Sequence, residues 1–311
     1  MKLTLIGLLF AVSNVAAKNA TVETQDWIKD GVFTQGVEGP AVDANGRLFA
    51  VNYGQEGTIG MVTRQGHAQM LLKLPNGSVG NGIRFDKQGN MFIADYVNHN
   101  VLRISAAALR KDLDISKHLS VYAHNSNMNQ PNDLAMMDNG IVFASDPNWQ
   151  NNTGNLWRID TDGSTHLVET NMGTTNGVAV SPDNKTLYVN ESVQRKVWRY
   201  NLDADGNVAN KQLHIAFSDF GLDGMRTDAQ GNLYIARYGA GMVVVVSPRG
   251  ELIEQINLKG QYPTNVAFGG DDGKSVFVTM QKRGAIEMFK ANFAGRNFAM
   301  SVADQGAKSP L

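Results

Sequence analysis

The chain has 311 residues, of which 42% are hydrophobic and 18% charged, a balance typical of a globular protein with a large core. Lys and Arg number 28 and Asp and Glu 29, so the net charge gives no reason to expect nucleic acid or an anionic membrane as a partner. The lack of cysteine excludes disulfides, thiol catalysis and thiolate metal sites.

The first 17 residues have the pattern of a secretory signal peptide. Lys2 supplies a positive charge, residues 3–12 form an apolar run, and the small residues Val15, Ala16 and Ala17 precede the expected cleavage point. No other stretch approaches the roughly 18 apolar residues of a membrane helix. We therefore expect residues 1–17 to be removed. The mature chain, residues 18–311, is then a single periplasmic or secreted domain with no membrane association.

One phrase recurs six times along the mature chain. It consists of a polar residue, an apolar strand, a tight turn with a Gly at or near its end, and a second apolar strand. The copies begin at Glu38, Asn81, Asn132, Asn176, Asp223 and Asn265. Each copy predicts a β-hairpin, because its turn residues favour positive φ and β-branched, aliphatic and aromatic residues flank the turn.

Further strands follow most of these hairpins. A third apolar segment is seen at residues 101–104 and a fourth at residues 166–169, among other copies. Four strands every ~40–50 residues are typical of a propeller blade. The sequence therefore predicts an all-β, six-bladed β-propeller. The main exception to the strand pattern is a short surface helix expected at residues 105–112.

The six residues that begin the repeats should meet at one mouth of the central channel, because the innermost strand of each blade lines that channel. All six are acids or amides. Carboxylate and amide oxygens suit a hard cation, and calcium prefers 6–8 oxygen ligands at ~2.3–2.6 Å. The alternative is that these side chains cap strand entries by bonding to their own backbones.

The ordered segments Glu38-Gly-Pro, Asn132-Asp, Asn176-Gly and Asp223-Gly resemble the SMP-30/gluconolactonase/luciferin-regenerating-enzyme family, across residues 31–290. The resemblance implies one catalytic divalent ion at the channel mouth. It implies metal ligands at Glu38, Asn176 and Asp223, with Asn132 completing the shell or contacting substrate. Asp223 matches the acid that activates water or attacks directly. The implied ion is calcium, with zinc, manganese or magnesium as alternatives.

Two positions depart from the family pattern. Gln130 stands where sugar lactonases of the family often carry Arg, and Leu134 stands where animal members carry Gly. Both departures weaken the assignment of an aldonolactone as the substrate. Gln130 can still donate hydrogen bonds to a hydroxylated ring, but it brings no charge.

The loops after the second strand of each blade should rim the same mouth. The longest runs from residue 146 to residue 155, and Trp149 in it could roof a pocket. Tyr53, His99, Arg195 and Tyr238 occupy equivalent loops. The expected substrate contacts are Asn81, Gln130, Asn132, Trp149 and Tyr238.

These features favour a calcium-dependent hydrolase of the gluconolactonase type that opens a small lactone, with Asp223 as base or nucleophile. A second hypothesis is phosphotriester, fluorophosphate or aryl ester hydrolysis by the same ion. A third is a binding propeller without turnover, because residues 90–104 resemble an NHL-repeat phrase. The expected partner of the enzyme is a small lactone or ester.

Overall fold

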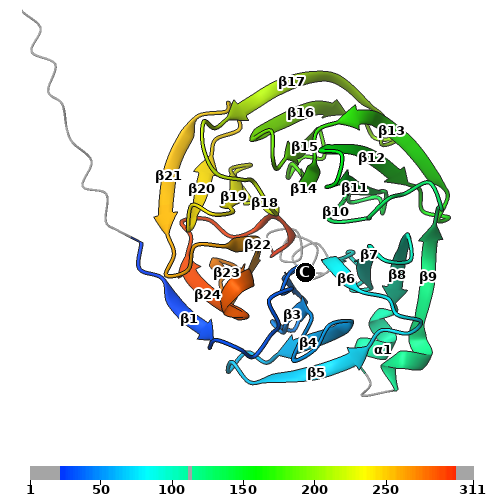
Figure 1. The fold of residues 1–311 in the computed structure, drawn as a ribbon, viewed down its shortest axis with the longest axis vertical. Helices are drawn as coiled ribbons and strands as arrows, with labels where there is room; N and C mark the ends of the chain where they lie inside the picture. Colours follow the sequence, from blue (N-terminus) through cyan, green and yellow to red (C-terminus); the bar gives the residue numbers. More distant parts are fainter. Residues whose placement is uncertain (1–21, 111–113, 299–311) are drawn as a thin grey trace, which may run out of the picture.

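Six antiparallel four-stranded sheets are arranged around a central axis in the computed structural model, which describes residues 22–110 and 114–298 (Figure 1). This arrangement confirms the predicted six-bladed propeller. The predicted signal peptide, residues 1–17, lies outside the described residues. Among the residues described, no helix is long and apolar enough to cross a membrane.

The blades follow one another in chain order, each running from its inner to its outer strand. Blade 1 contains β2 (Ala41–Val42), β3 (Leu48–Val51), β4 (Thr58–Val62) and β5 (Ala68–Lys73). Blade 2 contains β6 (Gly80–Phe85), β7 (Met91–Asp95), β8 (Asn100–Ile104) and β9 (Leu119–His124). Blade 3 contains β10 (Leu134–Met136), β11 (Val142–Asn148), β12 (Thr153–Ile159) and β13 (Thr165–Met172).

The second half of the chain repeats this order. Blade 4 contains β14 (Thr175–Val180), β15 (Thr186–Glu191), β16 (Lys196–Leu202) and β17 (Val208–Ala216). Blade 5 contains β18 (Met225–Thr227), β19 (Leu233–Arg237), β20 (Met242–Val246) and β21 (Leu252–Asn257). Blade 6 contains β22 (Pro263–Gly269), β23 (Ser275–Met280), β24 (Ala285–Lys290) and β1 (Gln25–Ile28).

Blade 6 closes the ring with a strand that the repeat pattern did not reveal. Its outermost strand is β1, which comes from the other end of the chain and pairs antiparallel with β24. Arg283 binds Asp26 at 2.9 Å and the buried Glu287 at 2.6 Å, and Lys259 also binds Asp26 at 2.9 Å. The two ends of the propeller are therefore joined by both backbone pairing and charge.

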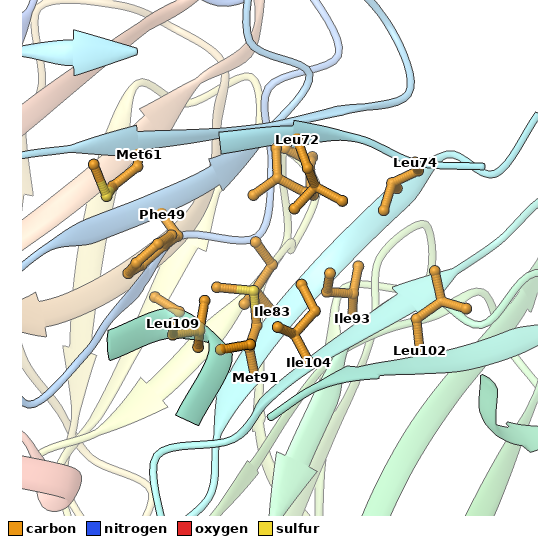
Figure 2. Packing of buried hydrophobic residues seen from close by; sticks show 14 residues of the cluster. Phe49, Met61, Leu72, Leu74, Ile83, Met91, Ile93, Leu102, Ile104 and Leu109 are labelled. Atoms are coloured by element: carbon orange, nitrogen blue, oxygen red, sulfur yellow. The ribbon is translucent and has the colours of Figure 1, made fainter. Parts of the chain in front are cut away.

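Helical segments are few among the described residues. Helix α1 (Ala106–Arg110) lies within the predicted 105–112 helix and is followed by η1 (Ile115–His118), while η2 (Gln281–Arg283) links β23 to β24. Leu109 of α1 packs into the apolar cluster between blades 1 and 2, beside Met91 and Ile104 (Figure 2).

The core consists of apolar layers between neighbouring blades. Phe49 and Ile59 of blade 1 share one cluster with Ile83 and Ile93 of blade 2. A sheet with two apolar faces can bury them only against its neighbours, so the ring of blades is the smallest unit that completes this core.

The glycine that follows a repeat-start residue is required by close packing at the channel mouth. A Cβ on Gly39 would lie 1.9 Å from the Asn81 carbonyl oxygen, and one on Gly224 would lie 1.8 Å from the Asn265 side chain. Gly82 and Gly177 abut the next blade in the same way. Glycine therefore lets each repeat-start residue approach its neighbour on the next blade.

The last described segment, residues 292–298, crosses the opposite end of the inner strands. Arg296 donates to the backbone oxygens of Met136 and Ser181 at 3.2 Å each. These two residues lie where the inner strands of blades 3 and 4 end, away from the repeat-start residues. Ala229 of blade 5 donates to the Ala294 oxygen at 2.8 Å. This segment links blades 3, 4 and 5 at the end of the channel opposite the repeat-start residues, whose own end stays accessible.

Candidate active site

A cavity of about 700 Å³ opens at the end of the propeller where the inner strands begin. It brings together every residue predicted to bind metal or substrate. These lining residues are Glu38, Asn81, Gln130, Asn132, Trp149, Asn176, Asp223 and Tyr238. Their convergence follows from the blade register, because each repeat places the same sequence position at the same end of an inner strand.

The sixth repeat-start residue lies deeper than the others. Asn265, at the start of β22, is fully buried and does not line the cavity. Its Nδ2 donates to a carboxylate oxygen of Glu38 at 3.1 Å. Asn265 therefore supports the floor of the cavity from below.

Glu38 is almost completely buried at that floor. Its carboxylate also accepts a hydrogen bond from the backbone N–H of Gly39. Burial and the nearby negative charge of Asp133 raise the pKa of Glu38, and the hydrogen bonds from Gly39 and Asn265 only partly oppose this rise. A carboxylate in this setting is stabilised by a bound cation.

Asp223 lies beside Glu38, surrounded by protein yet in contact with the cavity. Burial raises the pKa of Asp223 well above its ordinary value, and the nearby negative charge of Glu38 raises it further. A hydrogen bond from the Asn176 side chain opposes the rise. The backbone oxygen of Asp223 accepts from Asn190 Nδ2 at 2.6 Å, which fixes the start of blade 5.

Two amide oxygens at the same floor lack partners. Asn132 Oδ1 and Asn176 Oδ1 are buried and accept no hydrogen bond from any described residue. Buried acceptors without partners are rare in folded proteins and mark sites where a ligand or ion completes the bonding. Asn190, whose Nδ2 donates to the Asp223 backbone oxygen, likewise has a buried Oδ1 that accepts no hydrogen bond from any described residue.

This donor set fits a hard divalent cation. It consists of two carboxylates, Glu38 and Asp223, and the two unpartnered amide oxygens of Asn132 and Asn176. In the described part of the chain, no three His, Cys, Asp or Glu side chains gather as a metal cluster, so amide oxygens are needed to complete the set. Oxygen-only donors suit calcium or magnesium better than a thiolate- or imidazole-seeking metal.

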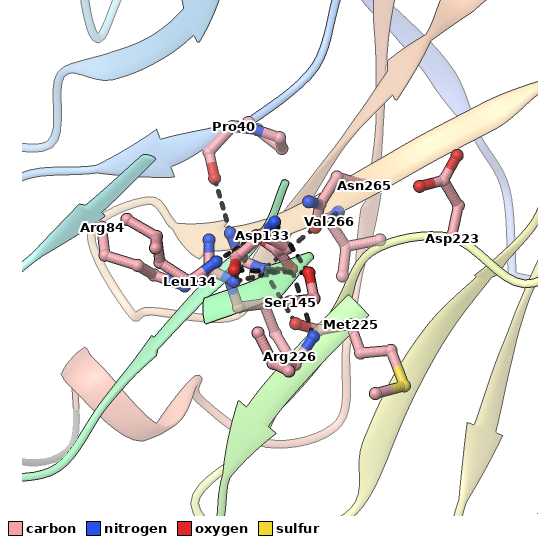
Figure 3. A network of polar contacts seen from close by, with 12 residues as sticks. Pro40, Arg84, Asp133, Leu134, Ser145, Asp223, Met225, Arg226, Asn265 and Val266 are labelled. Carbon is pink, nitrogen blue, oxygen red and sulfur yellow. Dashed lines mark hydrogen bonds and ion pairs between the residues drawn. The ribbon is translucent and has the colours of Figure 1, made fainter. Parts of the chain in front are cut away.

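A charged layer of Arg84, Asp133 and Arg226 packs against Asn265, the residue that supports the floor (Figure 3). The buried Asp133 contacts Arg84 at 2.9 Å and Arg226 at 3.7 Å. Arg226 also donates to Asn265 Oδ1 at 2.9 Å, which leaves the Nδ2 of that amide to face Glu38. Arg226 thus fixes the orientation of the Asn265 amide, with Oδ1 toward Arg226 and Nδ2 toward Glu38.

The stretch at residues 146–155, expected to be a long loop, is mostly strand. β11 and β12 pair up to Asn148 and Thr153, so only residues 149–152 form the turn that carries Trp149. The buried Asp146 accepts from the backbone N–H groups of Asn129 and Gln130 at 2.7 and 2.6 Å. Asp146 therefore holds the segment that presents Gln130 to the cavity.

The rim contains both predicted and unforeseen residues. Tyr238 donates to Gln281 Oε1 at 2.5 Å, and Arg195 also lines the cavity, whereas Tyr53 and His99 do not. Most of the unforeseen residues lie in the same loops after the second strands, and the repeat pattern does not indicate which residue of a loop faces the cavity. Lining residues not foreseen from the sequence include Asn52, Glu56, Tyr96, Ser192, Val193, Phe220, Thr264 and Gln281.

Comparison with known proteins supports the resemblance found in the sequence. The family description SMP-30/Gluconolactonase/LRE-like region matches residues 36–282. The 6-deoxy-6-sulfogluconolactonase of Pseudomonas putida is 32% identical over 171 residues, 52% of this chain and 59% of that protein. The gluconolactonase of Zymomonas mobilis is 26% identical over 220 residues, 64% of this chain and 60% of that protein. The chain thus spans about three fifths of the length of these two relatives.

A longer alignment and two solved structures complete the comparison. The diisopropyl-fluorophosphatase of Loligo vulgaris is 25% identical over 285 residues, 82% of this chain and 88% of that protein. A calcium-binding protein, regucalcin, from Agrobacterium tumefaciens has a TM-score of 0.74 at 20% identity, covering 88% of this chain and 97% of its own. A gluconolactonase from Xanthomonas campestris has a TM-score of 0.72 at 20% identity, covering 90% and 93%. Both structures confirm the propeller fold.

Proposed function

Because the chain belongs to the SMP-30/gluconolactonase/LRE-like family, we propose that it is a divalent-metal-dependent hydrolase that opens a small lactone ring, with calcium as the metal. One observation carries the proposal. Two carboxylates with raised pKa values, the buried Glu38 and the half-buried Asp223, meet two unpartnered amide oxygens at the floor of a single cavity. The lactonase names of two relatives support the choice of substrate.

In this proposal Glu38, Asn132, Asn176 and Asp223 hold the ion. When bound, calcium would polarise a carbonyl oxygen and stabilise the negative charge that develops on it. Asp223 lines the cavity, and in this proposal its carboxylate accepts a proton or attacks the substrate. Glu38 stays locked by its bonds to Gly39 and Asn265, which suits a ligand better than a group that must move.

The walls of the cavity supply the proposed substrate contacts. Asn81 donates to the Asn132 backbone oxygen at 3.2 Å, so its side chain is anchored and its oxygen can face the cavity. Gln130 offers an uncharged amide whose backbone is held by Asp146. Trp149 and Tyr238 border the cavity as aromatic surfaces.

Turnover measured with a panel of compounds tests this function. We expect purified protein to hydrolyse lactones in the presence of calcium, to lose activity with EDTA and to regain it when calcium is restored. Aldonolactones, thiolactones, aryl esters and fluorophosphates should be compared. Hydrolysis that EDTA leaves unchanged would contradict the metal role, and tight metal binding without turnover of any compound would favour a binding propeller.

Fluorophosphate hydrolysis is a second candidate, supported by the relative from Loligo vulgaris that aligns over most of both chains. An ion held by the same four oxygen donors would polarise a phosphoryl oxygen in place of a carbonyl oxygen. A fluorophosphate kcat/KM that exceeds the value for every lactone in the panel would favour this reading.

We also propose that the protein acts outside the cytoplasm after removal of residues 1–17, on the basis of the signal pattern at the N-terminus. N-terminal sequencing of protein from its native host should begin at or near Lys18. A mature protein that retains Met1 would rule out export by this route.

A further inference from the structure

The rim of the cavity differs between its two sides. Three large apolar side chains stand exposed on the side of blades 3 to 5: Trp149 is 42% exposed, Val193 46% and Phe220 52%. The side of blades 1 and 2 carries polar residues, where the Tyr96 hydroxyl donates to Glu56 at 3.5 Å. Exposed apolar side chains gathered at a cavity indicate a surface that a ligand covers.

Among the described residues that line the cavity, Arg195 is the one that carries a positive charge. Within the described ranges its guanidinium has no hydrogen-bond or ion-pair partner, whereas other arginines bordering the channel, such as Arg84 and Arg226, are bonded. An unpaired guanidinium beside apolar side chains is suited to bind a carboxylate, sulfonate or phosphate through two parallel hydrogen bonds.

The turn that carries Val193 and Arg195 is held rigidly between blades 3 and 4. Between them, the Gln194 side chain accepts from the Thr174 N–H at 2.9 Å and donates to the Asn152 oxygen at 3.1 Å. The Val193 N–H donates to Thr174 Oγ1 at 2.9 Å. Arg195 has φ 57 and is fixed on both sides by backbone hydrogen bonds. Rigid placement of rim residues lowers the entropy cost of binding.

Phe220 is held at the rim in a strained conformation. Its φ of 45 lies in the left-handed region, which a bulky side chain rarely adopts. The next residue, Gly221, donates to the Tyr238 oxygen at 3.0 Å, and Gly239 lies against the Phe220 ring, where a Cβ would come within 3.2 Å of it. Strain that neighbours maintain at a cavity is commonly linked to function.

We infer that the substrate is an anionic, apolar-substituted lactone or ester rather than an unsubstituted sugar lactone. The reacting group occupies the floor, an aromatic or branched apolar substituent packs against Val193, Phe220 and Trp149, and an acidic group binds Arg195. The cavity volume of about 700 Å³ leaves room for such a compound, within the range of roughly 300–1,000 Å³ typical of ligand sites. This inference rests on the proposed hydrolase function.

Three lactones of one ring size, bearing hydrogen, phenyl or carboxyphenyl, provide the test. We expect kcat/KM to rise from the first to the second and again to the third. Arg195→Gln should lower the carboxyphenyl-to-phenyl ratio about tenfold or more, the usual worth of a charged hydrogen-bonded contact. Phe220→Asn should lower the phenyl-to-hydrogen ratio, because Asn tolerates the left-handed backbone but removes the ring.

Lys196→Gln is the matched control for charge. Lys196 is the adjacent exposed cation, but its Nζ lies 5.7 Å from the Trp198 ring centroid and it does not line the cavity. Its loss should leave both ratios unchanged. Arg195→Gln that lowers kcat/KM for all three lactones equally, or no more than Lys196→Gln does, would overturn the inference.

Binding of a lactam that carries the carboxyphenyl group separates this inference from the proposed function, because a lactam resists hydrolysis. Calorimetry should show tighter binding than for the phenyl lactam, and Arg195→Gln should abolish the difference. If no lactone is hydrolysed but the lactam preference depends on Arg195, the recognition site stands and the hydrolase proposal fails. If lactones are hydrolysed while the lactams bind equally, the hydrolase stands and the recognition site is wrong.

Discussion

Individual residues at the channel mouth divide into those that face the cavity and those that hold them in place. Asn132 and Asn176 present unpartnered oxygens to the cavity, whereas Asn265 uses its amide to join Arg226 to Glu38. These residues have the same type and equivalent places in the repeat. Their roles differ because the layer beneath the floor contains Arg226 at blade 5.

Asp223 can be tested as a chemical group separately from its role as a ligand. Asp223→Asn keeps an oxygen donor but removes the proton acceptor. At saturating calcium the variant should bind substrate yet lose on the order of 10²–10⁴ in kcat, the usual range for general acid–base catalysis. Steady-state kinetics across a calcium titration provide the measurement. Recovery of near-normal kcat at high calcium would reduce Asp223 to a ligand.

Asn265 should act on the metal site without touching the metal. Asn265→Leu has a similar shape but breaks the link between Arg226 and Glu38, so we expect calcium affinity to fall about 10–100-fold, as is usual for outer partners of metal ligands. Calorimetric titration measures this affinity. Asn207→Leu, in an exposed turn away from the channel, is the control. Equal affinities in the two variants would show that Glu38 needs no support.

At the scale of the single strand, each outer strand is largely exposed and contains one buried residue, which in β17 is His214. His214 packs 4.9 Å from the Tyr188 ring, and neither of its ring nitrogens has a hydrogen-bond partner among the described side chains. Burial, with a smaller contribution from the charge of Arg199, lowers the pKa of His214 to about 4. The fold therefore holds this histidine neutral.

His214 should make the protein less stable in acid. The unfolded chain protonates this group near its ordinary pKa of about 6.5. Between about pH 6.5 and pH 4 the unfolded state therefore binds more protons, and the free energy of unfolding falls as the pH decreases. His214→Phe should reduce that fall while keeping the contact with Tyr188. Urea unfolding at pH 7.5 and 5.0 measures the change in the free energy of unfolding between the two pH values.

His67→Gln is the control for this experiment, because His67 is exposed. Its substitution should leave the difference in stability between the two pH values unchanged. If His214→Phe gives the same difference as the unsubstituted protein and the control, then the acid sensitivity arises from other groups.

At the scale of the whole molecule, the closure of the ring depends on β1. Without this strand, β24 would become an exposed edge, and unpaired edges promote association between chains. The buried Glu287 would keep its bond to Arg283, but Arg283 would lose its bond to Asp26.

A chain that begins at Gly31 should be less stable than one that begins at Val22. Loss of the Ile28 side chain from the core alone costs about 2 kcal/mol, and the strand pairing adds to this. We expect a lower unfolding midpoint in urea and aggregation at concentrations where the longer chain stays dispersed. Light scattering and urea titration measure the two effects. Equal midpoints for the two chains would mean that β1 does not close the ring.

Much of this protein was determined by the sequence alone. The six-bladed propeller and the gathering of Glu38, Asn132, Asn176 and Asp223 followed from one repeated phrase, because each repeat places its first residue at the same end of the channel. The short helix near residue 106 followed from the one break in the strand pattern. Local pattern is sufficient for features that each blade repeats.

Only the tertiary structure decided what differs from blade to blade. Several features join segments that are distant in the chain. They are the pairing of β1 with β24, the hydrogen bond from Asn265 to Glu38, the hydrogen bond from the Gln130 N–H to Asp146, and the apolar rim beside Arg195. No repeat encodes these contacts, since each depends on which neighbouring blade a side chain meets when the ring closes. Burial and charge at the site are set by that closure.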